Sequence, residues 1–418
     1  MSLLLRQVVL DGVPVDILLE DGLICQIAPE LPDAIADQVI EGAGKAVVPG
    51  LYNGHSHAAM TLFRGYSDDL ELMEWLTTKI WPLEAKLTEE LVYHGARLAC
   101  LEMIKSGTVF FNDMYWHFDA TARAVEEMGL RAALSGVIID LNDPARLKEQ
   151  IAVNCERFQK SLDFSPRIKF VLGPHAIYTV SQAGLEWVRD FAAENDLMIH
   201  THLSETEQEV KDCLDTHGLR PVEYLADLGL LSDKLVAAHT VWLNIDEMKL
   251  LEKYQVKVIN NPVSNMKLAV GKSFSYRHFI EHGLLVGLGT DGCGSNNNLD
   301  MFETMKFSAL LQKFAISDPT VQPADEAWRM ATEIGAEIFG LNGGVIAEGR
   351  DADLLLIDCD RPEMAPGHNL ISDLVYSASG AVVDTTIVAG KVLMQNRKVE
   401  GEAEIIAAAR DAAQRLMG

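Results

Sequence analysis

Eight short apolar runs in the middle of the chain, most of them separated by stretches with helical spacing, limit the fold more than any other feature. Strands that alternate with helices favour a parallel sheet, and eight such units favour a closed barrel. We therefore predict an α/β chain built on a (β/α)8 TIM barrel. One run lies just before His55, and the other seven lie at residues 109–112, 131–137, 169–173, 198–202, 235–238, 257–260 and 285–289.

Amphipathic helices are predicted between these runs, where apolar residues recur three to four positions apart. The last stretch of the chain is rich in Ala and Arg and has the same spacing, which predicts a closing helix on the outside of the barrel. The predicted helices include residues 87–106, 120–128, 183–194, 245–254 and 403–417.

The two ends of the chain share a different texture, in which apolar and polar residues alternate over short pieces. Asp-Gly pairs at 11–12 and 21–22 separate such pieces at 3–10, 14–19 and 23–27, a pattern typical of hairpin-linked strands. Pieces of the same kind return at 353–357, 382–388 and 391–394. We expect both ends to build one small β unit together.

Composition narrows the class of partner. The hydrophobic share of 48% and the charged share of 23% are typical of a folded globular chain. A formal net charge of -26 works against binding to a phosphate backbone, so we expect no nucleic acid and instead a small, neutral or weakly charged partner. Self-association into a homo-oligomer is left open by the sequence.

Cysteine usage and the N-terminus predict the compartment. Six cysteines are scattered without a C-x-x-C pair, which fits a reducing cytoplasm. The first residues lack the basic start and the long apolar region of a secretory leader, and no apolar stretch is long enough for a membrane span. The cysteines are Cys25, Cys100, Cys155, Cys213, Cys293 and Cys359.

The pair His55 and His57 is the first candidate for a metal site. In an extended segment, side chains at positions i and i+2 point to the same side, so both rings can face one ion. Taken alone, the pair is also compatible with two polar residues at the end of a strand. The decision therefore depends on what the other strand ends carry.

Other ionisable residues follow the apolar runs at just those ends. His202 ends one run and is followed by Glu205 on the turn, His239 ends the next, and Asp291 follows the last. An ionisable group at the end of a buried strand is costly unless it is paired or ligating. Because strand ends meet at one rim of a barrel, these residues together predict a metal site.

The remaining histidines are interpreted as structural. His200 shares a face of its strand with His202, and we expect it to lie in the barrel interior without a role in the chemistry. The others fall on predicted helices or loops without partners in register. They are His94, His117, His217, His278, His282 and His368.

Several longer motifs resemble the amidohydrolase superfamily and, within its aromatic deaminase branch, the methylthioadenosine/S-adenosylhomocysteine deaminases. The resemblance extends from about residue 3 to about residue 396. The motifs are Pro-Gly-Leu-Tyr-Asn-Gly-His55-Ser-His57, Leu-Met-Glu-Trp75-Leu, Ile-Trp-Pro-Leu-Glu84, His202-Leu-Ser-Glu205, Ala-His239, Asn261-Pro-Val-Ser-Asn-Met-Lys-Leu268 and Asp291-Gly-Cys-Gly-Ser-Asn-Asn-Asn-Leu-Asp300.

The resemblance implies a barrel domain at residues 50–344, a small β-sandwich domain formed by residues 1–49 and 345–400, and a C-terminal helix at 401–418. It also implies one divalent metal, zinc or iron, held by His55, His57, His202 and Asp291. Two-metal relatives need a modified lysine at the end of the fourth strand. That strand here ends in Gly-Pro-His175, so no second metal is expected.

The implied reaction is hydrolytic deamination of an adenine ring, giving the inosine analogue and ammonia. The metal lowers the pKa of a bound water and so supplies hydroxide. Glu205 would protonate the ring nitrogen beside the attacked carbon, and Asp291 would pass a proton to the departing ammonia. His239 would orient the hydroxide and stabilise the tetrahedral intermediate.

Substrate contacts follow from the same resemblance. Glu84 would accept hydrogen bonds from ribose, Trp75 would cover the sugar and His175 would contact the purine. Relatives that accept S-adenosylhomocysteine bind its carboxylate with arginines, and Gly136 stands where one is expected, while Arg146 is the candidate for the other. Glycine cannot replace a bidentate arginine contact. We therefore expect methylthioadenosine, adenosine or 5′-deoxyadenosine ahead of S-adenosylhomocysteine.

Two rival functions remain. The same scaffold can deaminate or dechlorinate triazines or guanine-like rings, for which a ribose contact such as Glu84 has no use. A catalytically inactive binding protein is the other rival, but such a chain should have lost metal ligands. The H-x-E and P-C-x-x-C signature of the nucleic-acid deaminases is absent from the sequence.

Overall fold

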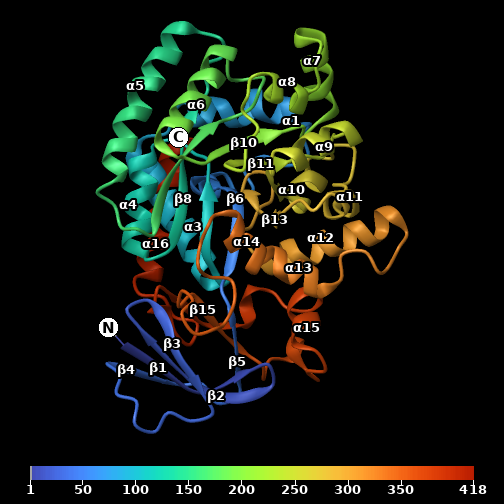
Figure 1. Ribbon diagram of the computed structural model, residues 1–418. Coiled ribbons are helices and arrows are strands. Elements are labelled where there is room, and N and C mark those ends of the chain that lie inside the picture. The colour runs from blue at the N-terminus through green and yellow to red at the C-terminus, as the bar shows by residue number, and fades with distance from the viewer. Residues whose placement is uncertain (1) are drawn as a thin grey trace.

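The computed structural model describes residues 2–418, which form two sheets joined end to end (Figure 1). The larger sheet is parallel throughout and has the order β13-β12-β11-β10-β9-β8-β7-β6-β14. The predicted barrel is confirmed. Its strands are β6 (Leu51–His57), β7 (Thr108–Asp113), β8 (Arg131–Ile138), β9 (Ile168–Pro174), β10 (Ile199–Leu203), β11 (Leu235–His239), β12 (Lys257–Asn260), β13 (Val286–Leu288) and β14 (Asp291–Gly292).

The eighth position of the ring is shared by two short strands. β13 pairs with β12 on one side, and after Gly289 and Thr290 the chain continues as β14, which pairs with β6. The hydrogen-bonded ring therefore closes through a split strand, and Asp291 lies at the closure.

Helices cover the outside of the barrel, and their first turns are capped as the sequence favours. Thr88 and Ser181 accept hydrogen bonds from backbone N–H groups of the helices that follow them, and Asn244 forms a capping box with Glu247. The longer helices are α3 (Glu89–Lys105), α4 (Phe118–Met128), α5 (Pro144–Ser161), α6 (Gln182–Asn195), α7 (Glu207–His217), α9 (Ile245–Lys253), α12 (Met301–Ile316) and α13 (Ala324–Ala331). Shorter ones are α8 (Pro221–Asp227), α10 (Pro262–Lys267), α11 (Tyr276–Glu281), α14 (Glu333–Ile338) and α15 (Leu370–Tyr376).

The smaller sheet is built by both ends of the chain, in the order β17-β16-β15-β5-β1-β2-β3, with β4 paired to β1. Asp11 and Gly12, like Asp21 and Gly22, have positive φ at the two predicted hairpin turns. Its strands are β1 (Ser2–Leu10), β2 (Val13–Glu20), β3 (Leu23–Ala28), β4 (Gln38–Glu41), β5 (Lys45–Pro49), β15 (Leu354–Asp358), β16 (Val383–Val388) and β17 (Lys391–Met394).

This sheet curls around a core of its own. The Ala352 N–H donates to the carbonyl of Gly22, and the Ile24 N–H donates to the carbonyl of Arg350, so the segment before β15 returns to β3. The enclosed side chains come from both ends of the sequence and include Leu5, Ile17 and Leu354. The domain boundaries predicted above remain a prediction.

The strand that carries the histidines differs from the expected one. The apolar pair Val47 and Val48 belongs to β5 of the terminal sheet, whereas His55 and His57 lie within β6, which begins at Leu51. β5 ends at Pro49 and β6 begins at Leu51, so the chain passes from the terminal sheet to the barrel sheet over Gly50. A Cβ at Gly50 would lie 2.3 Å from a methyl group of Val109, so the chain passes closely over β7 here.

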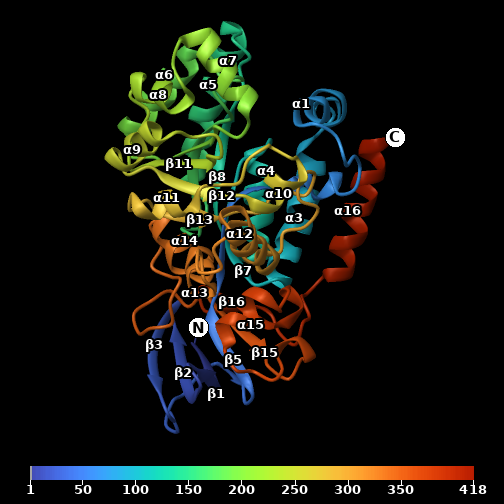
Figure 2. The ribbon, with the colours of Figure 1, turned by 90° about the vertical axis from the view of Figure 1, so that its right-hand side faces the viewer.

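The last helix, α16 (Glu402–Met417), runs along the outside of the barrel and packs against α3 (Figure 2). Ile405, Ala409, Ala412 and Leu416 are its buried residues, a helical stripe that matches the sequence expectation. Within residues 2–418, no helix combines the length and apolar character that crossing a bilayer requires.

Candidate metal and active site

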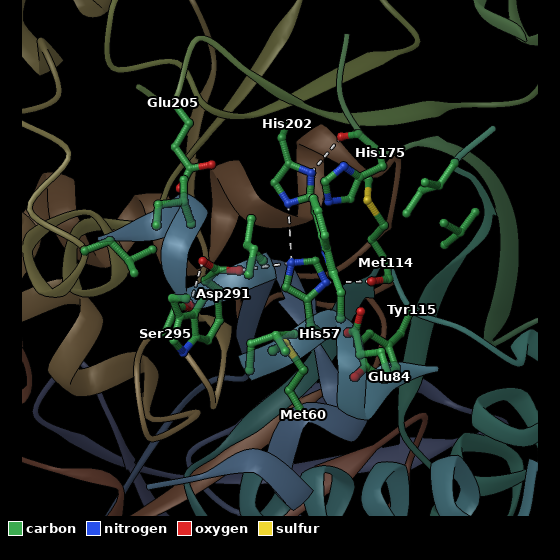
Figure 3. Close-up of a pocket in the computed structure, with 18 of the residues that line it drawn as sticks. His57, Met60, Glu84, Met114, Tyr115, His175, His202, Glu205, Asp291 and Ser295 are labelled. Atoms are coloured by element: carbon green, nitrogen blue, oxygen red, sulfur yellow. Dashed lines mark hydrogen bonds and ion pairs between the residues drawn. The ribbon is translucent and has the colours of Figure 1, made fainter. Parts of the chain in front are cut away.

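The ends of four barrel strands bring their ionisable side chains to one point (Figure 3). β6 carries His55 and His57, β10 carries His202, β11 ends at His239, and β14 begins at Asp291. One potential ligand atom from each of His55, His202, His239 and Asp291 lies within 4.8 Å of the others. Nε2 of His57 lies 3.1 Å from Oδ1 of Asp291 and 3.3 Å from Nε2 of His202.

The hydrogen bonds behind three of these rings set which nitrogen faces the centre. Nδ1 of His57 donates to the carbonyl of Met114 at 2.6 Å, and Nδ1 of His202 donates to the carbonyl of His175 at 2.7 Å. Nδ1 of His239 donates to Oδ1 of Asn265 at 2.8 Å. Because an oxygen acceptor requires a proton on Nδ1, the Nε2 lone pair of a neutral ring is left to face the centre.

Such lone pairs repel unless a cation lies between them, and this is the observation that fits a metal. Oδ1 of Asp291 lies 3.3 Å from Nε2 of His55 and completes a donor set of imidazoles and a carboxylate, which suits zinc and iron. Burial disfavours a charged imidazole, but the hydrogen bond with Asp291 outweighs it and raises the pKa of His57 to about 9.

Asp291 is held by both of its oxygens. Oδ2 accepts hydrogen bonds from the hydroxyls of Ser264 at 2.6 Å and Ser295 at 2.9 Å, which leaves Oδ1 for the centre. Burial opposes ionisation of this carboxyl, but the imidazoles of His55 and His57 beside Oδ1 hold its pKa well below the usual range. Asp291 is therefore an anionic acceptor on the rim.

Glu205 projects from the turn after β10 and lines the same pocket. Burial raises the pKa of its carboxyl, and its Oε1 lies 3.8 Å from Nδ1 of His239. The turn itself is held by Glu209, whose two carboxylate oxygens accept hydrogen bonds from the N–H groups of Ser204 and Glu205, each at 2.8 Å. Glu205, which can carry a proton, is therefore positioned by a turn that Glu209 holds in place.

Backbone strain is present at three of these strand ends. Ser204, His239 and Asp291 have φ values of 51°, 70° and 62°, in the left-handed region that side chains other than glycine rarely adopt. Each costs on the order of 1 kcal/mol or more and persists only where the surrounding structure holds it. The rim has the strained backbone that often accompanies functional sites.

The centre opens into a pocket with about 700 Å³ of empty space, including the part open to solvent. Three short consecutive helices cover it: α1 (Leu72–Trp75), a π-helical turn (Leu76–Ile80) and α2 (Trp81–Glu84). Trp75 is buried and its Nε1 donates to the carbonyl of Ser67, while Glu84 accepts a hydrogen bond from Nε1 of Trp116 at 3.3 Å. Burial raises the pKa of Glu84.

His175 follows β9 and lies beside the centre. Its Nδ1 lies 2.9 Å from the hydroxyl of Thr179, and its ring centroid is 4.7 Å from that of His202. All nine site residues predicted from the sequence therefore line the pocket or lie in the group of side chains at its base: Trp75, Glu84, His175, Glu205, His55, His57, His202, His239 and Asp291.

Comparisons with known proteins place the chain. Residues 46–393 match the Amidohydrolase family. The chain belongs to this family.

Close relatives cover most of this amidohydrolase. A 5′-deoxyadenosine deaminase of Methanospirillum hungatei is 49% identical over 384 residues, which are 91% of this chain and 85% of the relative. A 5-methylthioadenosine/S-adenosylhomocysteine deaminase of Archaeoglobus fulgidus is 50% identical over 388 residues, 92% and 91% of the two chains. The crystal structure of an adenosine deaminase from Xanthomonas campestris with bound zinc has a TM-score of 0.92 at 34% identity and covers 99% of this chain and 98% of that one.

The sequence motifs contain the residues that support the amidohydrolase centre, but the motifs alone do not reveal this role. Ser264 and Asn265 belong to the motif Asn-Pro-Val-Ser-Asn and lie on α10, one turn of which contacts both Asp291 and His239. Ser295 lies in the loop after β14. The available signal in the sequence was the adjacent polar pair Ser264 and Asn265 in a strand-end motif. Spacing alone could not show which residues this pair contacts.

The structure places Gly136 away from the pocket. A Cβ at this position would lie 2.1 Å from Oδ1 of Asn154 and 2.6 Å from the ring of Phe170, so it points at α5 and β9. The pocket is lined instead by the neighbours Val137 and Ile139. Because successive side chains of a strand point to opposite faces, Gly136 gives no information about the substrate.

Proposed function

We propose that this amidohydrolase is a metal-dependent hydrolytic deaminase that converts adenine nucleosides to inosine analogues and ammonia. The observation that carries the proposal is a buried group of histidines and one aspartate at the base of a pocket that also contains Glu84. Relatives at 49% and 50% identity named as deaminases of this substrate class support it.

The proposed metal ligands are His55, His57, His202 and Asp291, with zinc as the first candidate and Fe²⁺ as the second. When bound, the metal lowers the pKa of a water toward neutrality and so supplies hydroxide for attack on C6 of the purine. We assign His239 to a position beside the metal and not to the ligand set. The hydrogen bond from its Nδ1 to Asn265 aims Nε2 at the space where the reacting groups meet.

The chain's own residues move the protons. Glu205, whose pKa is raised by burial, carries a proton to the ring nitrogen beside C6 and so makes that carbon electrophilic. Asp291 accepts a proton through Oδ1 and returns it to the departing ammonia, while Ser264 and Ser295 hold Oδ2 in place. His239 orients the nucleophile and stabilises the charge that develops on it.

The nucleoside is held by side chains that line the pocket around the centre. Glu84 accepts hydrogen bonds from ribose hydroxyls, Trp75 covers the sugar and His175 contacts the purine. The position of Glu84 supports this assignment, because Nε1 of Trp116 orients its carboxylate at 3.3 Å and leaves acceptor capacity for a ligand.

The 5′ substituent would extend toward a second cavity that shares Trp81, Glu84 and Trp116 with the pocket. Arg146 and Arg157 line this cavity. Since Gly136 no longer argues against a carboxylate, the proposed substrates are 5-methylthioadenosine, adenosine and 5′-deoxyadenosine together with S-adenosylhomocysteine.

A substrate panel tests this proposal. Ammonia release would be measured with zinc-loaded protein for the four nucleosides, for adenine, guanine and cytosine, and for a triazine. We expect kcat/KM to be highest for an adenine nucleoside and at least tenfold lower for adenine, which lacks the sugar. A triazine or guanine as the best substrate would replace the proposal with its rival on the same scaffold.

Partners and compartment complete the proposal. A small nucleoside is the expected partner and nucleic acid is not, given the net charge of -26. All six cysteines are free, which supports the expected cytoplasmic location. Light scattering of the purified chain would decide whether it forms a homo-oligomer.

A further inference from the structure

His200 lies directly behind His55 at the base of the centre. Its side chain is almost fully buried, and its Nε2 lies 2.9 Å from Nδ1 of His55. The two rings meet edge to face, with centroids 4.9 Å apart and an angle of 80° between their planes. His200 was expected to be a structural residue of the barrel interior, but this contact connects it to a candidate metal ligand.

The partner of His55 differs in kind from the partners of its neighbours. Nδ1 of His57, His202 and His239 each meets an oxygen atom, which can only accept a hydrogen bond. Nδ1 of His55 meets an imidazole nitrogen, which can either donate or accept. The contact alone therefore leaves the proton position on His55 undefined.

Metal binding requires one of the two arrangements. Nε2 of His55 is buried and has no hydrogen-bond partner within the described part of the chain. It lies 3.3 Å from Oδ1 of Asp291, on the side of the centre. For Nε2 to bind a metal, the proton of His55 must sit on Nδ1. His200 must then accept that proton's hydrogen bond with Nε2 and carry its own proton on Nδ1.

The far nitrogen of His200 argues against a purely structural role. Its Nδ1 is buried and has no hydrogen-bond partner among residues 2–418, whether or not it carries a proton. An unsatisfied buried polar atom costs about 1–3 kcal/mol, and an apolar side chain at this position would avoid that cost. The stability of the barrel therefore does not explain a histidine here, whereas the contact with His55 does.

We propose that His200 is a positioning residue that fixes His55 as the Nδ1–H tautomer and so directs the Nε2 lone pair at the metal. The inference rests on the metal site of the proposed function, and it extends to all four imidazoles a common rule: Nδ1 is anchored and Nε2 faces the centre.

Three variants test the proposal through metal affinity. In His200→Phe the acceptor is lost, and we expect zinc to bind about 10- to 100-fold more weakly in chelator competition, the usual effect of removing a partner behind a metal ligand. In His200→Gln the amide oxygen can accept from Nδ1, and we expect most of the affinity to return. His94→Phe removes a histidine on α3 outside the pocket lining, and should leave the affinity unchanged.

The tautomers can also be observed directly. In ¹⁵N-histidine spectra of the zinc-loaded wild-type protein, both His55 and His200 should carry their proton on Nδ1. In metal-free His200→Phe, the Nε2–H form of His55 should appear. This measurement on the wild-type protein keeps the proposal testable even if His200→Phe does not fold.

Two results would overturn the proposal: wild-type zinc affinity in a folded His200→Phe protein, or a proton on Nε2 of His200 in the zinc-loaded wild type. Failure of the proposed function looks different. A wild-type protein that binds zinc but deaminates no nucleoside would refute the function and leave the role of His200 intact.

Discussion

Buried polar groups occur both in the terminal sheet and at the barrel rim, and the two regions treat them differently. In the terminal sheet, Asp16 accepts from the N–H groups of Gln7 and Leu31, each at 2.9 Å. Asp353, just before β15, accepts from Nε of Arg131 at 2.8 Å and from the N–H of Ala389 at 2.7 Å. These carboxylates are satisfied within the fold.

At the rim, the buried groups converge on one another instead. Among the residues that the structure describes, none forms a hydrogen bond with Nε2 of His55, and Nε2 of His57 faces Nε2 of His202 at 3.3 Å. The contrast distinguishes buried polar groups that stabilise the fold from buried polar groups that are arranged to bind a ligand. Mutation should therefore separate the two regions into one that controls activity and one that controls folding.

The largest effect is expected at His55. His55→Ala should abolish metal-dependent turnover, with a loss of more than about a thousandfold in kcat/KM, because a ligand to the catalytic metal is gone. Circular dichroism should still show a folded chain. An active, metal-free His55→Ala protein would contradict the whole account of the site.

Replacement of His57 and replacement of His239 should differ in their effect on the metal content of the protein. His57→Ala should lose the metal, whereas His239→Ala should keep it and lose about 10²- to 10³-fold in kcat, as expected when a group that stabilises developing charge is removed. Metal analysis and kinetics on the same preparations would check this. Loss of metal from His239→Ala would make His239 a ligand, which its distance to the centre also permits.

Replacement of Asp353 should lower stability and leave activity almost unchanged, the opposite of the effect expected at the site. Asp353→Ala leaves Arg131 with its weaker partner Asp351, at 3.4 Å, and we expect the free energy of unfolding to fall by about 3 kcal/mol. The value of kcat at 25 °C should stay within about twofold of the wild type. Urea unfolding followed by tryptophan fluorescence measures the first quantity, and a strong loss of kcat in the folded protein would break the division between regions.

A smaller effect is expected at Glu84. Glu84→Gln should lower kcat/KM for adenosine by about 10- to 100-fold, since a hydrogen bond to a charged acceptor contributes about 1.5–3 kcal/mol. Turnover of free adenine, however slow, should be unchanged because it has no ribose. Equal losses for both substrates would place Glu84 in the chemistry, and no loss for adenosine would remove the ribose contact.

Sequence reasoning could predict the barrel because each strand is a buried apolar run, and it could predict the rim because His202, His239 and Asp291 end such runs. It placed the start of the first barrel strand less well, because β5 and β6 are separated only by Gly50 and both are largely buried. The family assignment was confirmed by the match over residues 46–393.

What sequence reasoning missed depends on contacts between strands. Which face Gly136 occupies follows from the register of β8, and the role of His200 follows from the approach of β10 to His55. Ser264 and Asn265 acquire their roles only when α10 is seen beside β14 and β11. None of these relations has a period or a spacing that the sequence alone displays.

The split eighth strand has a further consequence for how the molecule assembles. β14 pairs with β6 through two residues, Asp291 with Ser56 and Gly292 with His57. A metal bound by His55, His57 and Asp291 would cross-link the barrel at this seam. Metal binding and closure of the barrel would then be coupled, so that zinc uptake during refolding reports when the last strand has docked.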